Sequence, residues 1–302
     1  MNALTRIWQD GRRAERVAYA VGAALFLSGV LHTIVLVTTG GSWLGPLSMR
    51  KAVTFGLSFG LTLASVAWAT SFLTVRPSWR SALLGAFTAA SVAEVVLVSL
   101  QSWRGVPSHF NFETPFDNAV SMTLAAGGGV LILTVIGFTA AALVEPGPEA
   151  PSLRLAVRAG LVVLLVALAT GAVMIARGVV AARGGDPQLA YTTAGALKPL
   201  HAVAMHAILV LPALAWLLRF TRWPEAHRMR VVVIAVVADA VLTAVIGVES
   251  FTGVSPLAAP LPVLALSALA AAVLAGTGAY ALTGGEPTAR FARISDGKAR
   301  GR

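Results

Sequence analysis

Long apolar stretches alternate with short polar connections along most of this 302-residue chain. Each stretch is about 20 residues or longer, which is the length that an α-helix needs to cross the hydrocarbon layer of a membrane. The eight stretches are residues 17–38, 52–74, 81–102, 119–143, 154–180, 199–219, 229–250 and 256–283. The pattern predicts an all-α, polytopic membrane bundle of eight helices within residues 1–283. Residues 284–302 are predicted to form a disordered basic tail in the cytoplasm.

The composition agrees with this pattern, because 57% of the residues are hydrophobic, 12% are charged and the mean hydropathy is +0.79. Such values lie far outside the range of soluble domains. The chain has no cysteine. Disulfides, Fe–S clusters and thiolate zinc sites are therefore excluded, and a metal or haem would need His, Met, Tyr or carboxylate ligands.

The net charge of +10 could indicate a nucleic-acid partner, but the placement of the charges argues for membrane topology. If the N-terminus lies in the cytoplasm, only six of the 23 basic residues fall on the other face: Arg50, Lys51, Arg104, Arg177, Arg183 and Lys198. The positive-inside rule then predicts a plasma (inner) membrane protein with both termini in the cytoplasm. The lipid bilayer is the expected partner, and nucleic acid is not.

The two halves of the chain, residues 17–143 and 154–283, share short sequence similarities. The strings "AEVVLVSLQ" and "ADAVLTAVI" align Glu94 with Asp239. A lysine begins the second predicted helix of each half and a tryptophan lies near its other end; these are Lys51 and Trp68, and Lys198 and Trp216. Four helices per half is an even number, so the similarities predict two parallel repeats related by an axis along the membrane normal.

Polar chemistry is concentrated in one connection, "QSWRGVPSHFNFETPFD", residues 101–117. Its Trp and Phe residues suit the membrane interface, and its Gly and Pro residues interrupt the helix. We expect a lid over the outer mouth of the bundle, with His109 or Asn111 in contact with residues 17–38 or 199–219. A rigid plug that only closes the helix ends is the alternative. The candidate ligand-binding residues here are Gln101, Arg104, Ser108, His109 and Asn111.

Further candidates lie within the predicted helices or directly before them, between the outer face and the middle of the membrane: His32, Lys51, Glu94, Lys198, His201, His206 and Asp239. Buried carboxylates are costly unless protonated or paired, so Glu94, Asp239, His32 and His206 are expected to line one cavity. Structural ion pairs and separately packed histidines are the alternative. His201 and His206 are five residues apart, about 140° around a helix, which disfavours one metal ion bound to both. The candidate metal ligands are His32, His109, His201 and His206.

Two of these motifs carry a resemblance. "RGVPSHFN" followed by "TPFD", and "LHAVAMHAILVLP", resemble motifs of a family of uncharacterised bacterial multi-pass membrane proteins. The resemblance implies no known activity or cofactor, and it singles out Arg104, Ser108, His109, Asn111, His201 and His206. Ile208 stands where a Gln is expected in relatives, which puts a hydrogen-bonding role at that position in doubt.

Four functions remain open at this point, and the sequence does not decide whether the protein is an enzyme. The favoured one is binding or transport of a small ligand or protons at an outer-leaflet pocket of His, acid and Lys residues under the 101–117 loop. The second is a redox protein with b-type haem or quinone. The third is an intramembrane metal-dependent hydrolase, for which no catalytic residue is assigned. The fourth is a non-catalytic subunit or assembly partner.

Overall fold

The computed structural model describes residues 11–45, 47–144, 147, 149–186, 189–190 and 195–284. Within these ranges it confirms the predicted all-α bundle, since eight helices are long and apolar enough to cross a membrane. They are α2 (Arg13–Thr38), α3 (Arg50–Ser71), α4 (Pro77–Trp103), α5 (Pro115–Val144), α6 (Pro151–Arg183), α8 (Lys198–Leu218), α9 (Glu225–Thr252) and α10 (Leu261–Thr283), with a short 3-10 helix η1 (Pro256–Ala258) before α10. The predicted cytoplasmic tail from residue 285 onward lies outside the described residues.

Proline and glycine set several helix ends. Pro77, Pro115 and Pro151 are the first residues of their helices, where the missing N–H is not needed and the fixed φ suits a helix. Gly253 ends α9 with a φ of +76°, in the left-handed conformation that glycine adopts readily. The helix boundaries therefore follow local backbone chemistry as well as hydropathy.

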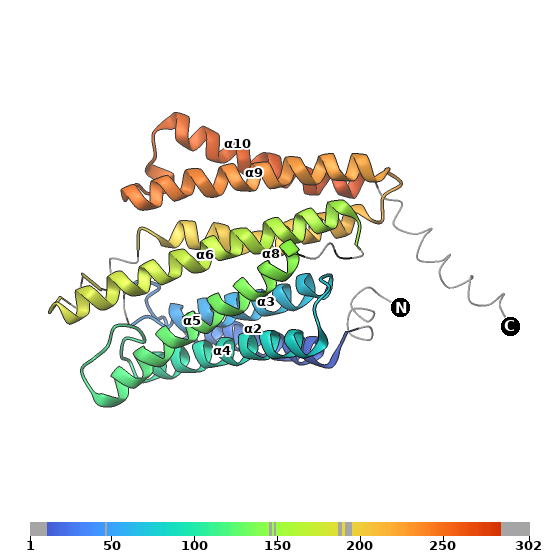
Figure 1. Ribbon diagram of the computed structural model, residues 1–302. Helices are drawn as coiled ribbons and strands as arrows, with labels where there is room; N and C mark the ends of the chain where they lie inside the picture. Colours follow the sequence, from blue (N-terminus) through green and yellow to red (C-terminus); the bar gives the residue numbers. More distant parts are fainter. Residues whose placement is uncertain are drawn as a thin grey trace.

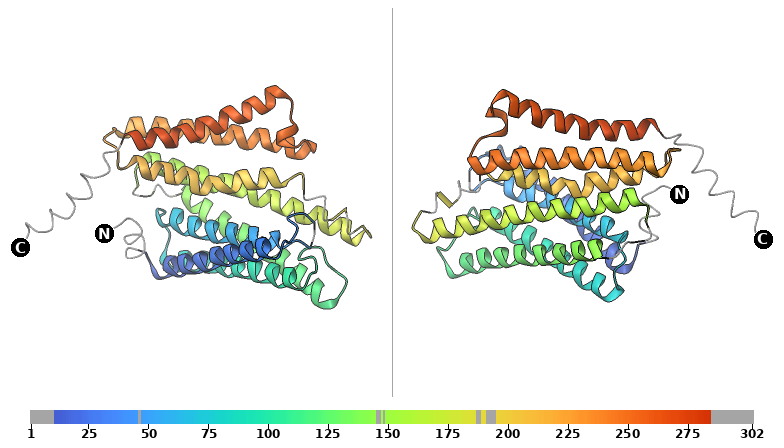
Figure 2. Two further views of the ribbon diagram at one scale, coloured as in Figure 1. Left: turned by 180° about the vertical axis from the view of Figure 1, so that it is seen from behind. Right: turned by 45° about the horizontal axis from the view of Figure 1, so that its top comes forward.

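The helices run side by side, and α2 begins and α10 ends at the same end of the bundle (Figure 1). We call this the termini end, and the opposite end the distal end. The described connections 39–45, 104–114 and 253–260 lie at the distal end. The two further views show α9 and α10 along one edge of the bundle, away from α2 and α4 (Figure 2).

Each half of the chain pairs its four helices in the same way. In the first half α2 packs most extensively on α3, and α4 packs on α5. In the second half α6 packs on α8, and α9 packs on α10. The α2–α3 pair approaches closely through Gly22, Gly29, Gly56 and Gly60, because a Cβ at any of them would fall within 3 Å of the facing helix.

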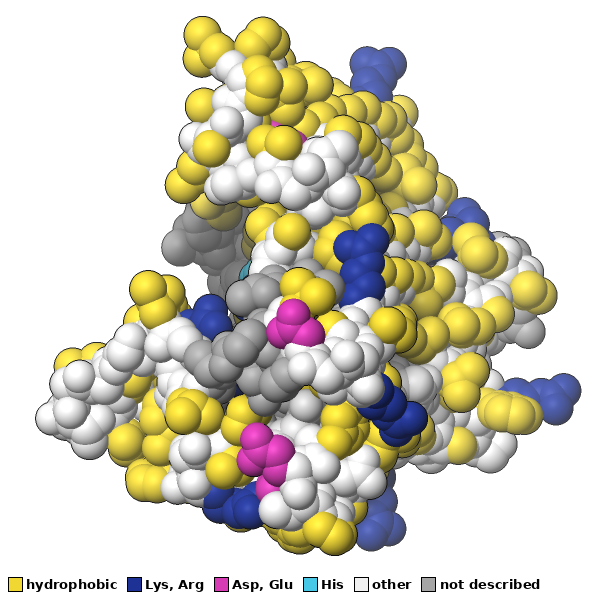
Figure 3. All heavy atoms as spheres, turned by 90° about the vertical axis from the view of Figure 1, so that its left-hand side faces the viewer, with side chains coloured by type: hydrophobic (Ala, Val, Ile, Leu, Met, Phe, Trp, Pro, Cys, Tyr) yellow, Lys and Arg dark blue, Asp and Glu magenta, His cyan; other side chains and the backbone are white. Residues whose placement is uncertain are grey.

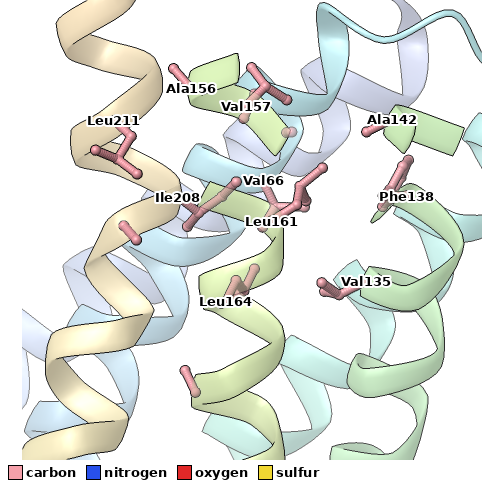
Figure 4. Close-up of a cluster of buried hydrophobic side chains, with 14 of the residues drawn as sticks. Val66, Val135, Phe138, Ala142, Ala156, Val157, Leu161, Leu164, Ile208 and Leu211 are labelled. Carbon is pink, nitrogen blue, oxygen red and sulfur yellow. The ribbon is translucent and has the colours of Figure 1, made fainter. Parts of the chain in front are cut away.

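The two halves meet through α3 with α8 and through α5 with α6. Buried apolar side chains fill this junction, among them Val66 of α3, Phe138 of α5, Leu161 of α6 and Ile208 of α8 (Figure 4). The apolar core therefore lies at the centre of the bundle and joins the two halves.

Candidate functional site

The first turns of α3 and α8 bring three basic residues together at the distal end. Arg50 and Lys51 begin α3, Lys198 begins α8, and the two helices pack on each other. The charge of Lys51 is repelled by Lys198 and Arg50, and that of Lys198 is repelled by Arg50. A helix N-terminus adds its own partial positive charge, and two such termini face the same end here. The distal ends of α3 and α8 therefore concentrate positive charge. Figure 3 shows this face, where basic side chains lie among apolar ones.

The 104–114 connection is held at its base by an ion pair. Arg104 Nη1 lies 2.5 Å from Asp117 Oδ1, and Gln101 Nε2 donates to the same oxygen at 2.8 Å. Arg104 also donates to the Gln101 side-chain oxygen. Thr114 Oγ1 donates to Asp117 Oδ2 and accepts a hydrogen bond from the Asp117 N–H, which caps the start of α5. Gln101 and Arg104 thus bond to Asp117 at the start of α5, and these bonds join the two ends of the connection.

The middle of the connection folds back onto the bundle. Phe110 adopts a φ of +64° and is buried. Its ring lies over Gly178 of α6, where a Cβ would come within 2.2 Å of the ring. The neighbouring Phe112 lies under the guanidinium group of Arg183, also on α6. The connection therefore reaches from α4 across to α6 and covers part of the distal end.

His109 lies between this connection and α3. Its ring packs against Phe55 of α3 and Phe110, and its Nδ1 lies 2.9 Å from Ser108 Oγ. Burial, and then the nearby Lys51 ammonium group, lower the pKa of His109 to about 3. The imidazole is therefore neutral at physiological pH, next to the basic residues of α3 and α8.

Asn111 and Ser108 are buried within the same connection. The Asn111 N–H donates to Ser121 Oγ of α5, and the Ser121 hydroxyl donates to the Asn111 carbonyl oxygen. The Asn111 side-chain oxygen accepts from the Glu113 N–H, whereas its Nδ2 is buried without a partner. The hydrogen bonds of Asn111 and the ring contacts of His109 thus involve α3, α5 and the connection itself, whereas residues 17–38 or 199–219 were expected to touch them.

The three membrane histidines each donate from Nδ1 to a backbone carbonyl. His32 donates to Ser28, and its Nε2 accepts the indole N–H of Trp103 at 3.0 Å. His201 donates to Ala167 of α6, over Gly171. His206 donates to Ala202 on its own helix, and its side chain is exposed. Both ring nitrogens of His32 are therefore occupied, and the local bonds of the other two fix their tautomers.

The two membrane acids lie in different halves. Glu94 of α4 is buried with its Oε1 over Gly127 of α5, where a Cβ would approach to 2.9 Å. Asp239 of α9 is buried, and its Oδ2 has no hydrogen-bond partner. Helix α4 packs with α2, α3 and α5, whereas α9 packs with α6, α8 and α10. Among the described residues, no group of three or more His, Asp or Glu could hold a metal ion.

Several residues that matter to this site drew little attention in the sequence. Arg50 was predicted only to be one of the outer charges and Glu249 only to end the helix at 229–250 on the outer side, and no prediction was made for Thr243 or Ser250. Glu249, Thr243 and Ser250 are buried in α9 with side-chain oxygens that lack partners. Asp239, Thr243 and Ser250, at spacings of four and seven residues, share one side of the helix, and this was the available signal.

Comparisons of the chain with protein-family models, with curated proteins and with solved structures find no match.

Proposed function

We propose that this integral membrane protein binds a small anionic ligand at the distal ends of α3 and α8 and carries it across the membrane. The observation that supports this most is the approach of Arg50, Lys51 and Lys198 to one another. Three basic side chains gathered at one end of two packed helices give this region a positive potential, which attracts anions. A carboxylate, phosphate or sulfate group is the complementary ligand.

The two helix ends favour the same class of ligand. The N–H groups of a first helical turn have no partner within the helix and point toward its N-terminal end, where they bind anions. Helices α3 and α8 place two such ends side by side, with basic side chains on each. The N–H groups of Arg50, Lys51 and Lys198 already donate to the preceding turns, so the helix ends contribute mainly their partial positive charge. Broken or terminating helices that aim their N-termini at an anionic substrate are a recurring device of membrane transporters.

The 104–114 connection supplies a neutral polar wall to this site. His109 contacts α3 beside Lys51 and keeps an uncharged imidazole, because burial and the Lys51 charge hold its pKa near 3. A neutral imidazole can donate or accept a hydrogen bond without adding to the positive charge. We infer that the connection acts as the cover of the site, anchored by the Arg104–Asp117 pair.

The arrangement of the halves supports transport in addition to binding. The pairing of helices is the same in both halves, and α3 and α8, which carry the basic residues, lie where the halves meet. This is the placement expected of a ligand site between parallel repeats, each of which can move as a unit. With both termini in the cytoplasm, as the charge distribution predicts, the distal end faces outward.

The redox and hydrolase alternatives draw less support. A metal hydrolase needs about three converging ligands. Instead, His32 bonds to Trp103, His201 to Ala167 and His206 to Ala202, so each histidine has a different partner. His201 and His206 use Nδ1 for their carbonyl bonds, which leaves Nε2 as the nitrogen that could bind a haem iron. An absorption spectrum of the purified protein tests haem binding directly. A Soret band would favour the redox alternative.

The test uses the full-length protein in detergent, unfolded by heat and followed through tryptophan fluorescence. Succinate, phosphate and sulfate are compared with sodium chloride at equal ionic strength. At least one of them should raise the Tm of the wild type, and Lys51→Gln or Lys198→Gln should weaken its apparent affinity by about tenfold, the effect of one lost charged contact.

Arg177→Gln is the matched control, because Arg177 is also a distal-end cation but lies over Phe251 of α9. It should respond as the wild type does. If none of the three anions stabilises the protein, or if all three variants respond equally, the anion site is wrong. Uptake of the stabilising anion into proteoliposomes then separates transport from binding alone.

A further inference from the structure

Buried polar atoms without partners are concentrated on α9 and α10. Among the described residues these include Asp239 Oδ2, Thr243 Oγ1, both carboxylate oxygens of Glu249 and Ser250 Oγ on α9, and Ser267 Oγ on α10. The four α9 side chains are between 2% and 8% exposed. Burying such a group without a hydrogen bond is unfavourable, because the group loses its bonds to water and gains none in the protein. Because so many unpartnered polar atoms lie on one helix, we expect protons or water molecules to stabilise them.

Three of the four α9 residues with free atoms follow one side of the helix, and Glu249 adjoins that side at its distal end. Thr243 lies one turn from Asp239, and Ser250 lies two turns beyond Thr243, so the three share a face. Glu249 is next to Ser250, about 15 Å from Asp239 along the helix axis at 1.5 Å per residue. Since α9 ends at the distal end, Glu249 and Ser250 are near that surface and Asp239 is near the middle of the bundle.

The hydroxyls of Thr243 and Ser250 differ from several other buried hydroxyls of the described helices. Thr88, Ser91 and Thr139 each donate to the carbonyl four residues earlier in their helices. Such bonds satisfy a hydroxyl locally. Thr243 and Ser250 make no bond of this kind. Their hydroxyl groups remain available to the carboxylates or to water on the same face.

No described cation neutralises the two carboxylates by an ion pair. The titratable groups on the distal halves of the packed helices are Arg177 and Arg183 on α6 and Lys198, His201 and His206 on α8; η1 and the first half of α10 have none. Arg177 lies over Phe251, Arg183 over Phe112, and His201 and His206 donate to backbone carbonyls. Lys198 is exposed near Arg50.

The half of α9 toward the termini end is different. Its buried residues include Val231, Val232 and Ala235, which cannot pass a proton. The polar side chains of α9 therefore extend from the distal end as far as Asp239, and apolar side chains follow beyond it. Asp239 is thus the innermost residue of this polar face.

We propose that Asp239 and Glu249 bind exchangeable protons and that the α9 face is a proton path open only to the distal side. A proton from distal water adds to the Glu249 carboxylate. It passes on through the hydroxyls of Ser250 and Thr243, each of which accepts one proton at oxygen and releases its own. Water bridges the two turns between them. The proton then neutralises Asp239, where it stays. This inference does not depend on the anion site at α3 and α8.

The experiment uses the full-length protein in nanodiscs and infrared difference spectra between alkaline and acidic buffer. A protonated carboxyl group in an apolar site gives a C=O band that shifts in D₂O. Asp239→Asn and Glu249→Gln should each remove part of this band. Glu149→Gln, at the termini end and paired with Arg219, should leave it unchanged. If Asp239→Asn does not fold, Asp239→Glu should keep the band at a shifted position.

The path is tested by the rate at which the Asp239 band shifts after mixing with D₂O. Thr243→Ala and Ser250→Ala should slow this exchange. Thr252→Ala, whose exposed hydroxyl donates to Val248 on the same helix, should not. Absence of the band, or a band of equal size in Asp239→Asn and Glu249→Gln, overturns the proton sites. Exchange at the wild-type rate in both hydroxyl variants overturns the path.

Discussion

Trp68 of α3 and Trp216 of α8 meet edge to face across the junction of the two halves, with ring centroids 6.0 Å apart and planes at 81°. Each also meets a phenylalanine four residues later, Phe72 or Phe220, again nearly edge to face. The sequence comparison aligned these tryptophans, and the structure places them against each other near the termini end. Edge-to-face packing is a favoured arrangement of two aromatic rings. This contact closes the junction at the end opposite to Lys51 and Lys198.

The first prediction concerns this aromatic contact. Trp68→Leu and Trp216→Leu should each destabilise the protein, and a double-mutant cycle should give a coupling of about 0.5–1.5 kcal/mol, the value of an aromatic pair beyond its buried area. The free energy of unfolding in mixed micelles provides the measurement. Additive losses would show that the two rings do not stabilise each other.

A second prediction concerns Arg80, which is 2% exposed at the termini end. Its guanidinium group donates to the carbonyls of Thr70 and Leu73, and lies 3.5 Å from a Glu15 carboxylate oxygen. Glu15 keeps its closer ion pair with Arg12 at 2.8 Å, so the loss falls on the two carbonyl oxygens, and leaving such buried acceptors without this donor costs about 1–3 kcal/mol. Arg80→Ala should therefore lose about that much stability. Arg16→Ala, at an exposed position of α2, should stay within about 0.5 kcal/mol of the wild type.

The sequence predicts the fold well because a membrane leaves few choices. An apolar stretch in lipid must satisfy its backbone within a helix, so length and hydropathy alone locate the eight helices. The same reasoning placed Arg80 among the ordinary cytoplasmic charges. Its burial depends on Glu15 and on carbonyls at the end of α3, and periodicity does not encode contacts between such distant positions.

The candidate site shows the same limit. The 101–117 stretch was expected to hold ligand-binding groups, but Gln101 and Arg104 find their partner in Asp117 of the same stretch. His32 lies against Trp103, 71 residues away, and Glu94 lies over Gly127. Residue types and spacing indicated the distal end as the polar region. The partner of each side chain follows from helix rotation and packing, which the pattern does not determine.

A third prediction tests how the 104–114 connection is seated. Gly178→Ala places a methyl group where the Phe110 ring lies, so either the ring or the connection must move. Overpacking of this kind costs about 1–3 kcal/mol. Gly85→Ala is the matched control, because a Cβ there meets nothing within 4 Å, and its better helix propensity should stabilise the protein by about 0.5–1 kcal/mol.

Since the chain has no cysteine, a single Ser108→Cys reports exposure. Its thiol should react faster in the Gly178→Ala background than in the Gly85→Ala background, and equal rates would contradict this seating.

A fourth prediction tests the topology. A reporter fused after the last residue should give a cytoplasmic signal, because the basic residues are concentrated at the termini end. A cysteine introduced at Gly40, in a distal connection, should react with a membrane-impermeant thiol reagent added to intact cells. Labelling of Gly40→Cys only after the cells are opened would reverse the orientation, and the anion and proton sites would then face the cytoplasm.

The last prediction concerns the pH dependence that His109 gives to stability. Burial and the Lys51 charge lower the pKa of His109 from 6.5 to about 3. The unfolded chain therefore binds a proton at this residue between pH 6.5 and 3 and the folded protein does not. Stability from the neutral imidazole is complete above pH 6.5 and is lost as the pH falls toward 3, by up to about 1.4 kcal/mol for each pH unit.

His109→Gln removes the titrating group, so its free energy of unfolding should change less over this range than that of the wild type. Thr123→Ala changes an exposed side chain of α5 that does not titrate, and it should keep the wild-type slope. A wild-type slope in His109→Gln as well would show that the imidazole is not held neutral beside Lys51.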